Sequence, residues 1–186
     1  AYENENNLKA LKFFKSSKYL IDKHDMYLKR YIFSLVLESK VQEAINELKF
    51  NFGKNNSNFF ESYLLLSLDS LKKSNFKKSL IFLIKSEKFI EQDNFKVAIY
   101  ESLKQYIYVF ENKKIQKEGK KIGKMSLINQ TFQNCYLGKS NTDTYFMNLI
   151  NDDYEEDLSR YKYFYVGYLI DNNRNNEARD IVDKLN

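Results

Sequence analysis

The sequence predicts an all-α protein of about ten helices that pack in antiparallel pairs. The first indication is composition: the 186 residues include no Pro and only 5 Gly, whereas average usage would give about 9 and about 13. This shortage disfavours turn-rich β-sandwiches, which need both residues at many corners. The second indication is periodicity, because apolar residues recur at spacings of three and four along most of the chain, as in amphipathic helices.

The predicted helices follow one another with short polar breaks between them. They cover 8–20, 27–36, 41–52, 59–71, 76–90, 95–112, 125–137, 143–150, 158–170 and 177–185. We expect Asp93 or Asn94 to cap the start of the helix over 95–112, and Gly138 to end the helix over 125–137. Breaks of this length are typical of connections between antiparallel helices.

Charge, cysteine content and hydropathy limit the classes of function. The net charge is +5 and the pI is about 9.0, which is compatible with nucleic acid, anionic lipid or an acidic partner, and equally with a Lys-rich codon bias. The single cysteine, Cys135, excludes an intramolecular disulfide. The longest apolar stretches fall far short of the ~20 residues of a membrane helix. The chain opens with Ala-Tyr-Glu and no Met, as a processed, exported form would.

Small side chains recur at fixed places among large ones in the segment 60–91. Its first helix carries Ser67, and its second carries Ser79 and Ser86. A small residue where two helices cross lets the backbones approach, and a large neighbour fills the adjacent hole. Helix pairs repeated at a period of about 30–40 residues predict a solenoid of stacked pairs.

This segment resembles the tetratricopeptide repeat (TPR), a helix–turn–helix unit of about 34 residues. Tyr63 and Phe76 fall on the two aromatic positions of the repeat pattern, and the three serines named above fall on its small positions. The family's Gly and two Ala are thus all Ser here, and Glu91 stands in place of the closing Pro.

Further copies of the pattern lie on both sides of this segment. Ala44, upstream, and Ala178, near the C-terminus, fall on the same small position as Ser79. The region 95–137 is a candidate for one more unit with an expanded turn. The run 63–76 also resembles a segment of exported TPR proteins of alphaproteobacteria, which would imply a periplasmic or envelope-associated scaffold.

The TPR resemblance implies a right-handed α-α superhelix whose concave face binds a peptide or a partner protein. By this resemblance, the positions that line the concave face are Lys29, Phe33, Val36, Glu61, Leu64, Leu68, Leu71, Arg160, Tyr163 and Ile170. We expect Phe33, Leu64 and Tyr163 to be exposed apolar anchors. Lys29 and Arg160 are expected to bind carboxylates of the partner.

Six lysines gather between two of the predicted helices and suggest an alternative function. They are Lys113, Lys114, Lys117, Lys120, Lys121 and Lys124, and the glycines among them predict a flexible connection near 113–124. Such a patch could bind nucleic acid or an anionic membrane surface. Nucleic acid is the weaker expectation, because arginine is scarce and the aromatic residues just upstream lie at helical spacing.

The chain lacks the residue patterns that catalysis and cofactor binding need. His24, the only histidine, lies beside Asp25 with no nucleophile nearby in sequence, and one His with one Cys cannot form a usual zinc site. Gly138-Lys139-Ser140 lacks the earlier glycine of a phosphate-binding loop. We therefore predict a single non-catalytic TPR-like helical-repeat domain over 1–186, without cofactor or metal. Its C-terminal helices are a candidate surface for self-association.

Overall fold

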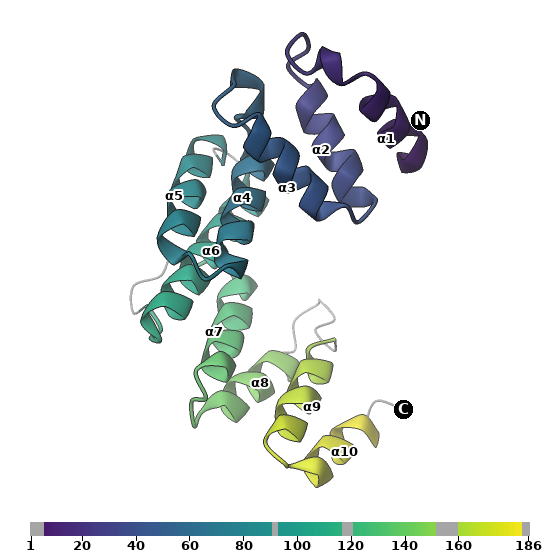
Figure 1. Cartoon of the computed structure of the whole chain (residues 1–186). Coiled ribbons are helices and arrows are strands. Elements are labelled where there is room, and N and C mark those ends of the chain that lie inside the picture. Colours follow the sequence, from purple (N-terminus) through teal and green to yellow (C-terminus); the bar gives the residue numbers. More distant parts are fainter. Residues whose placement is uncertain (1–5, 91–92, 117–120, 152–159, 184–186) are drawn as a thin grey trace. The chain divides into compact units, whose positions relative to one another are not determined.

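A computed structural model describes residues 6–90, 93–116, 121–151 and 160–183 (Figure 1). Over these ranges it holds ten α-helices, three short 3₁₀ helices and no strand, which confirms the all-α prediction. The α-helices are α1 Asn7–Ser16, α2 Tyr27–Leu37, α3 Val41–Phe50, α4 Phe60–Lys72, α5 Phe76–Ser86, α6 Asn94–Asn112, α7 Lys124–Tyr136, α8 Thr142–Ile150, α9 Tyr161–Asp171 and α10 Asn175–Asp183. The 3₁₀ helices are η1 Lys18–Leu20, η2 Asn55–Ser57 and η3 Glu87–Phe89.

Polar side chains set several helix starts. Asn6 accepts a hydrogen bond from the amide of Lys9 at the start of α1, and Asn75 accepts one from Lys78 at the start of α5, both at 3.1 Å. Of the two expected caps for α6, Asp93 takes the role, because its Oδ1 accepts from the amide of Lys96 at 3.0 Å. These bonds satisfy amides that lack a partner within the helix.

The chain folds as two compact units, Ala1–Tyr100 and Glu101–Asn186, and the boundary falls within α6. The core of the first unit is built from the apolar faces of α1, α2 and α3, and is completed by Ile21 after η1, by Phe59 before α4 and by Leu66 of α4. Its most deeply buried members are Leu11, Leu28, Tyr31, Ile32, Leu35, Ala44, Leu48 and Leu66. Each large apolar side chain buried in this way contributes about 1.5–3 kcal/mol to folding. A single domain over 1–186 remains a prediction.

Two serines lie where α4 and α5 cross. Ser67 and Ser79 are both fully buried. The hydroxyl of each donates to the backbone carbonyl of the other at 2.9 Å. The small side chains thus lie between the two helices, and both hydroxyls are hydrogen-bonded. The helices can therefore approach closely without leaving a buried polar group unpaired. The predicted placement of small residues at a helix crossing is confirmed for this pair.

Four helix pairs share one turn geometry. After α2, α4, α7 and α9, a residue adopts the left-handed conformation: Ser39 (φ 58°), Ser74 (φ 56°), Gly138 (φ 60°) and Asn173 (φ 60°). In each turn, the amide of this residue bonds to the carbonyl three residues before it. The next amide bonds to the carbonyl five residues before it, and all eight bonds measure 2.8 to 3.1 Å. This is the Schellman motif, which satisfies the last carbonyls of a helix.

The shared turn puts three helix pairs in the register expected from the sequence. Ala44, Ser79 and Ala178 each lie five residues after the left-handed residue of their own turn, and all three are buried. Within each unit, the two turns are 35 residues apart, from 39 to 74 and from 138 to 173. The equivalence of these three small residues, proposed from sequence, therefore has a common backbone geometry behind it.

The fourth pair, α7 and α8, was not assigned as a repeat copy from the sequence. Its turn is longer: α8 begins four residues after Gly138, whereas in the other three pairs the second helix begins two residues after the left-handed residue. Thr131 is fully buried, and its hydroxyl lies 3.3 Å from the carbonyl oxygen of Tyr145. When the two extra turn residues are allowed for, this contact occupies the place of the serine contact between α4 and α5.

The helices α6 and α7 do not form the expanded antiparallel pair expected over 95–137. The amide of Asn129 donates to Ser102 Oγ at 2.8 Å, and further along both helices the ring of Tyr136 lies 4.7 Å from that of Phe110. The later residue of α6 contacts the later residue of α7, so the two helices run in the same direction where they touch. The connection over 113–123 is long enough for the chain to run back along α6 before α7 begins.

Candidate functional site

Three of the residues predicted to line the binding face come together in the first unit. The Lys29 ammonium of α2 lies 3.4 Å from Glu61 Oε2 of α4 and 5.7 Å from the centre of the Phe33 ring. The expected faces of α2 and α4 are therefore neighbours. Lys29 thus already faces one carboxylate within the chain, and its contact with a carboxylate of a partner stays a prediction.

The other predicted residues differ in exposure. Val36 packs against the core of the first unit. Phe33, Leu64 and Leu71 are half-buried, which is less exposure than we expected for Phe33 and Leu64 as anchors. Leu68, Arg160, Tyr163 and Ile170 are exposed, and Tyr163 has 70% of its surface accessible.

An aromatic groove of about 610 Å³ lies in the second unit. Helices α7, α8 and α9 supply its side chains. Six rings line it: Phe132, Tyr136, Phe146, Tyr163, Phe164 and Tyr168. We refer to these residues, together with Cys135, Gly138, Gly167, Asp171 and Asn172, as the aromatic groove. Of these residues, only Tyr163 was predicted from the sequence to line a binding face.

The rings of the aromatic groove pack against one another in fixed orientations. Phe146 of α8 is fully buried. Phe132 of α7 meets Phe146 edge-on at 6.0 Å and meets Phe164 of α9 edge-on at 5.1 Å. Edge-to-face packing at these distances is favourable and holds each ring in place. The groove therefore has a largely pre-formed wall, which lowers the entropic cost of binding.

Gly167 leaves an opening in this wall. It lies in the interior of α9, and a Cβ atom added there would meet no atom within 4 Å. A glycine inside a helix costs about 0.5–1 kcal/mol relative to alanine. No packing reason accounts for that cost, because the position has room for a side chain.

A hydrogen-bonded network fixes α8 to α9 beneath the groove. Asp143 of α8 accepts from the Tyr165 hydroxyl and from the Arg174 guanidinium, both at 2.7 Å. Burial, together with the bond to Asp143, raises the pKa of Tyr165 to about 12, so this phenol stays protonated at neutral pH. Arg174 also pairs with Glu177 at the start of α10. The network holds the turn between α9 and α10 in place.

Asp171 is the sole charged side chain among the described residues that line the aromatic groove. It is exposed and forms no ion pair within the described ranges. Burial raises the pKa of the Cys135 thiol, and the negative charge of Asp171, which lines the same groove, raises it further. The last residues of α7 and α9, Tyr136 and Asp171, both lie in the groove, so two negative helix-dipole ends add to this charge.

The predicted lysine patch is described only in part. Lys117 and Lys120 lie outside the described residues. Lys114 and Lys121 are exposed. Lys113 hydrogen-bonds to the Tyr136 hydroxyl, and its ammonium lies 4.7 Å from the centre of that ring, so it is engaged with the aromatic groove. Lys124 begins α7 and is half-buried.

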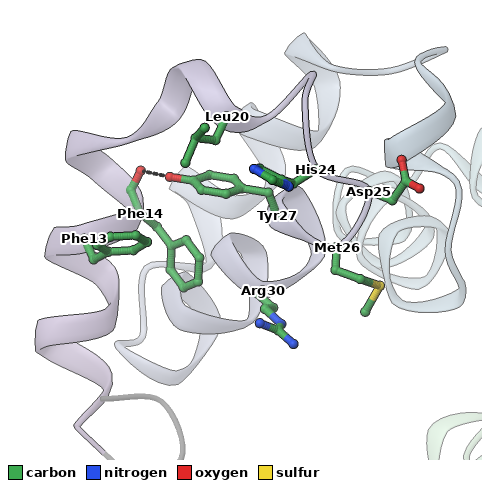
Figure 2. A pocket seen from close by; sticks show the side chains of 8 residues that line it. All are labelled: Phe13, Phe14, Leu20, His24, Asp25, Met26, Tyr27 and Arg30. Atoms are coloured by element: carbon green, nitrogen blue, oxygen red, sulfur yellow. Dashed lines mark hydrogen bonds between the residues drawn. The ribbon is translucent and has the colours of Figure 1, made fainter.

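A second pocket, of about 510 Å³, lies in the first unit between α1 and the start of α2 (Figure 2). Its wall includes the Tyr27 ring, whose hydroxyl donates to the carbonyl of Phe14 at 2.7 Å. His24 lies beside that ring, whereas the Asp25 side chain is well separated from it (Figure 2). The adjacent His24 and Asp25 thus do not pair as a general base and its orienting carboxylate would.

The fold and the site define an all-helical protein of repeated helix pairs with an aromatic groove. Comparison of the chain with protein-family models, with characterised proteins and with solved structures finds no match. In the described ranges, no three His, Cys, Asp or Glu side chains gather in a way that could hold a metal ion. None of the helices in those ranges has the length and apolar character needed to cross a membrane.

Proposed function

We propose that this chain is a non-catalytic scaffold of TPR-like helix pairs, stacked as a right-handed superhelix, that binds a peptide segment of a partner protein. The aromatic groove is the observation that supports the proposal. Tyr163 and Phe164 keep 70% and 56% of their surface exposed there. Large aromatic side chains of this kind dominate the binding energy of many protein interfaces.

Gly167 and the size of the groove favour the same function. A stability cost without a packing reason is typical of positions that serve binding. A volume of about 610 Å³ is in the usual range for sites that take small ligands or a few side chains. A peptide could therefore place one or two apolar side chains over Gly167, between the rings of α7 and α9.

The first unit offers a second surface in the same register. Phe33, Leu68, Phe132 and Gly167 each lie six residues before the left-handed residue of their own turn. Leu68 is exposed and Phe33 is half-buried. We propose this surface of α2 and α4 as a separate, weaker contact for a partner. The resemblance of the run 63–76 to exported proteins supports a periplasmic or envelope-associated location for the scaffold.

Peptide selection with two matched variants tests the proposed function. Ligands would be selected from a displayed random-peptide library on the full chain, and their affinity measured by fluorescence anisotropy. We expect Gly167→Leu to weaken binding about tenfold or more, because the new side chain fills the groove. Gln130→Leu introduces the same leucine side chain at an exposed position of α7 outside the groove, and it should leave affinity unchanged. Equal affinities for the two variants would refute the assignment of the groove.

A further inference from the structure

The charges around the aromatic groove indicate which side chain it takes, on the basis of the proposed function. We infer that the end of the groove formed by the last residues of α7 and α9 binds a lysine or arginine side chain of the partner peptide. The alkyl part of that side chain would lie against Phe132 and Phe164, and its cationic head would lie near Asp171.

Three features at this end of the groove favour a positive charge. The Asp171 carboxylate has no ion-pair partner in the described part of the chain. The faces of aromatic rings attract cations, and Tyr136 and Tyr168 both line the groove. The negative ends of the α7 and α9 dipoles lie at the same place. No lysine or arginine among the described residues lines the groove to oppose them.

One of the rings that line this end of the groove already attracts an ammonium group within the chain. Lys113 places its ammonium over the Tyr136 ring and donates a hydrogen bond to the tyrosine hydroxyl. Lys113 and Asp171 form no ion pair, and within the described ranges that carboxylate stays uncompensated. Lys113 does not itself line the groove, so the Asp171 carboxylate remains open to a cation of the partner.

Helix stability gives no reason for an acidic residue at position 171. Asp171 is the last residue of α9. A carboxylate there is repelled by the negative end of the helix dipole, whereas lysine, arginine or histidine would be attracted. Gly167, one turn earlier on the same helix, is also unfavourable for the helix. Two residues that weaken one helix and line one groove indicate that binding determines them.

The test uses three tripeptides and the amide signals of the glycines. N-acetyl-Leu-Lys-Leu-amide, its norleucine analogue and its glutamate analogue would be titrated into the ¹⁵N-labelled full chain and followed by NMR. Gly138 and Gly167 line the groove, whereas Gly53 lies in the first unit and serves as the internal control. We expect the lysine peptide to shift the two groove glycines and to bind about fivefold more tightly than the neutral analogue.

Two variants locate the charge that discriminates between the peptides. In Asp171→Asn, the preference for the lysine peptide over the norleucine peptide should fall to the smaller contribution of the rings and the helix dipoles, whereas Lys113→Gln should preserve or increase it. The inference is overturned if wild-type protein binds the norleucine or glutamate peptide as tightly as the lysine peptide, or if no tripeptide shifts the groove glycines. A groove that binds selected peptides without this charge preference would leave the proposed function standing, whereas insensitivity of those peptides to Gly167→Leu would remove it.

Discussion

Ser67 and Ser79 set how closely α4 and α5 can approach, because a larger side chain at either position would lie between two helix backbones. We predict that Ser67→Leu lowers the free energy of unfolding by about 1–3 kcal/mol through overpacking. Ser67→Ala should cost about 0.5–1.5 kcal/mol, the contribution of one hydrogen bond. Urea denaturation followed by circular dichroism measures both. Ser140→Leu, at an exposed serine, is the control, and an equal loss in that variant would contradict the explanation.

Asp69 makes a pH-dependent contribution to the stability of the first unit. Its burial would raise its pKa, but hydrogen bonds from Lys49 and Lys73, both at 2.7 Å, outweigh that effect and hold the pKa below its usual value. A carboxyl group whose pKa is lowered by folding stabilises the fold above its unfolded pKa and loses that effect as the pH falls through the folded pKa.

The variant Asp69→Asn tests this contribution. We predict a loss of about 1–3 kcal/mol in unfolding free energy near pH 7, because two charge-assisted hydrogen bonds are lost at a buried site. The difference from wild type should shrink as the pH falls below about 4, where the wild-type carboxyl also becomes protonated. Urea denaturation at pH 7 and pH 2.5 measures it. A difference that stays constant over this range would show that the charge of Asp69 is not the cause.

At the scale of helices and turns, the left-handed residues offer a reciprocal pair of substitutions. Ser74 adopts φ 56°, which a residue with a Cβ atom adopts at a cost of about 1–2 kcal/mol. Ser74→Gly should therefore raise the unfolding free energy by about 0.5–1 kcal/mol, and Gly138→Ala should lower it by a similar amount. Thermal and urea denaturation give both signs. If both variants change stability in the same direction, backbone strain does not control these turns.

We predict that helix α9 becomes more stable when Gly167 or Asp171, its two residues that are unfavourable for a helix, is replaced. Gly167→Ala should raise the unfolding free energy by about 0.5–1 kcal/mol, and Asp171→Asn by about 0.3–1 kcal/mol. Both variants would be measured by urea denaturation, alongside peptide affinity. Stabilisation combined with weaker binding is the expected result. A loss of stability in either variant would mean that the residue serves the fold and not the groove.

The periodicity of apolar residues and the size of side chains were sufficient to predict the helices and the register of most pairs. The spacing of apolar residues located all ten helices, and small residues fixed the register of three pairs, because both properties are local or nearly so. The pair α7 and α8 was missed because its turn has two extra residues. They shift the contact across the pair by two positions, so Thr131 contacts Tyr145 and the repeat pattern finds no small residue where it expects one.

The aromatic groove could be predicted only in part for a different reason. Its rings come from three helices, and an aromatic residue at helical spacing has the same pattern whether it packs in a core or lines a groove. Tyr163 was identified through its place in the repeat, whereas Phe132 and Tyr136 carry no local signal that separates the two roles. The pairing of Lys29 with Glu61 was also invisible, because it depends on how α2 lies beside α4.

At the scale of the whole molecule, two features could bind a partner: the aromatic groove and the positive charge of the chain. We predict that RNA, DNA and anionic phosphatidylserine vesicles bind the full chain weakly, with the same affinity when the six lysines of 113–124 are changed to glutamine. Titrations at 50 and 200 mM salt test this, since phosphate contacts lose affinity steeply over about that range. Tight, salt-sensitive binding lost in the variant would favour the basic module as the function.

The most direct test of the account is an amide map of peptide binding over the full chain. A peptide selected on the wild-type protein would be titrated into the ¹⁵N-labelled chain, and every assigned amide followed. The account predicts that the largest shifts fall on α7 and α9 around Gly138 and Gly167, and that the Gly167→Leu variant needs about tenfold more peptide, or more, to show them on the remaining amides. Shifts confined to the lysines of 113–124, or to the outer faces of the second helices of the pairs, would contradict it.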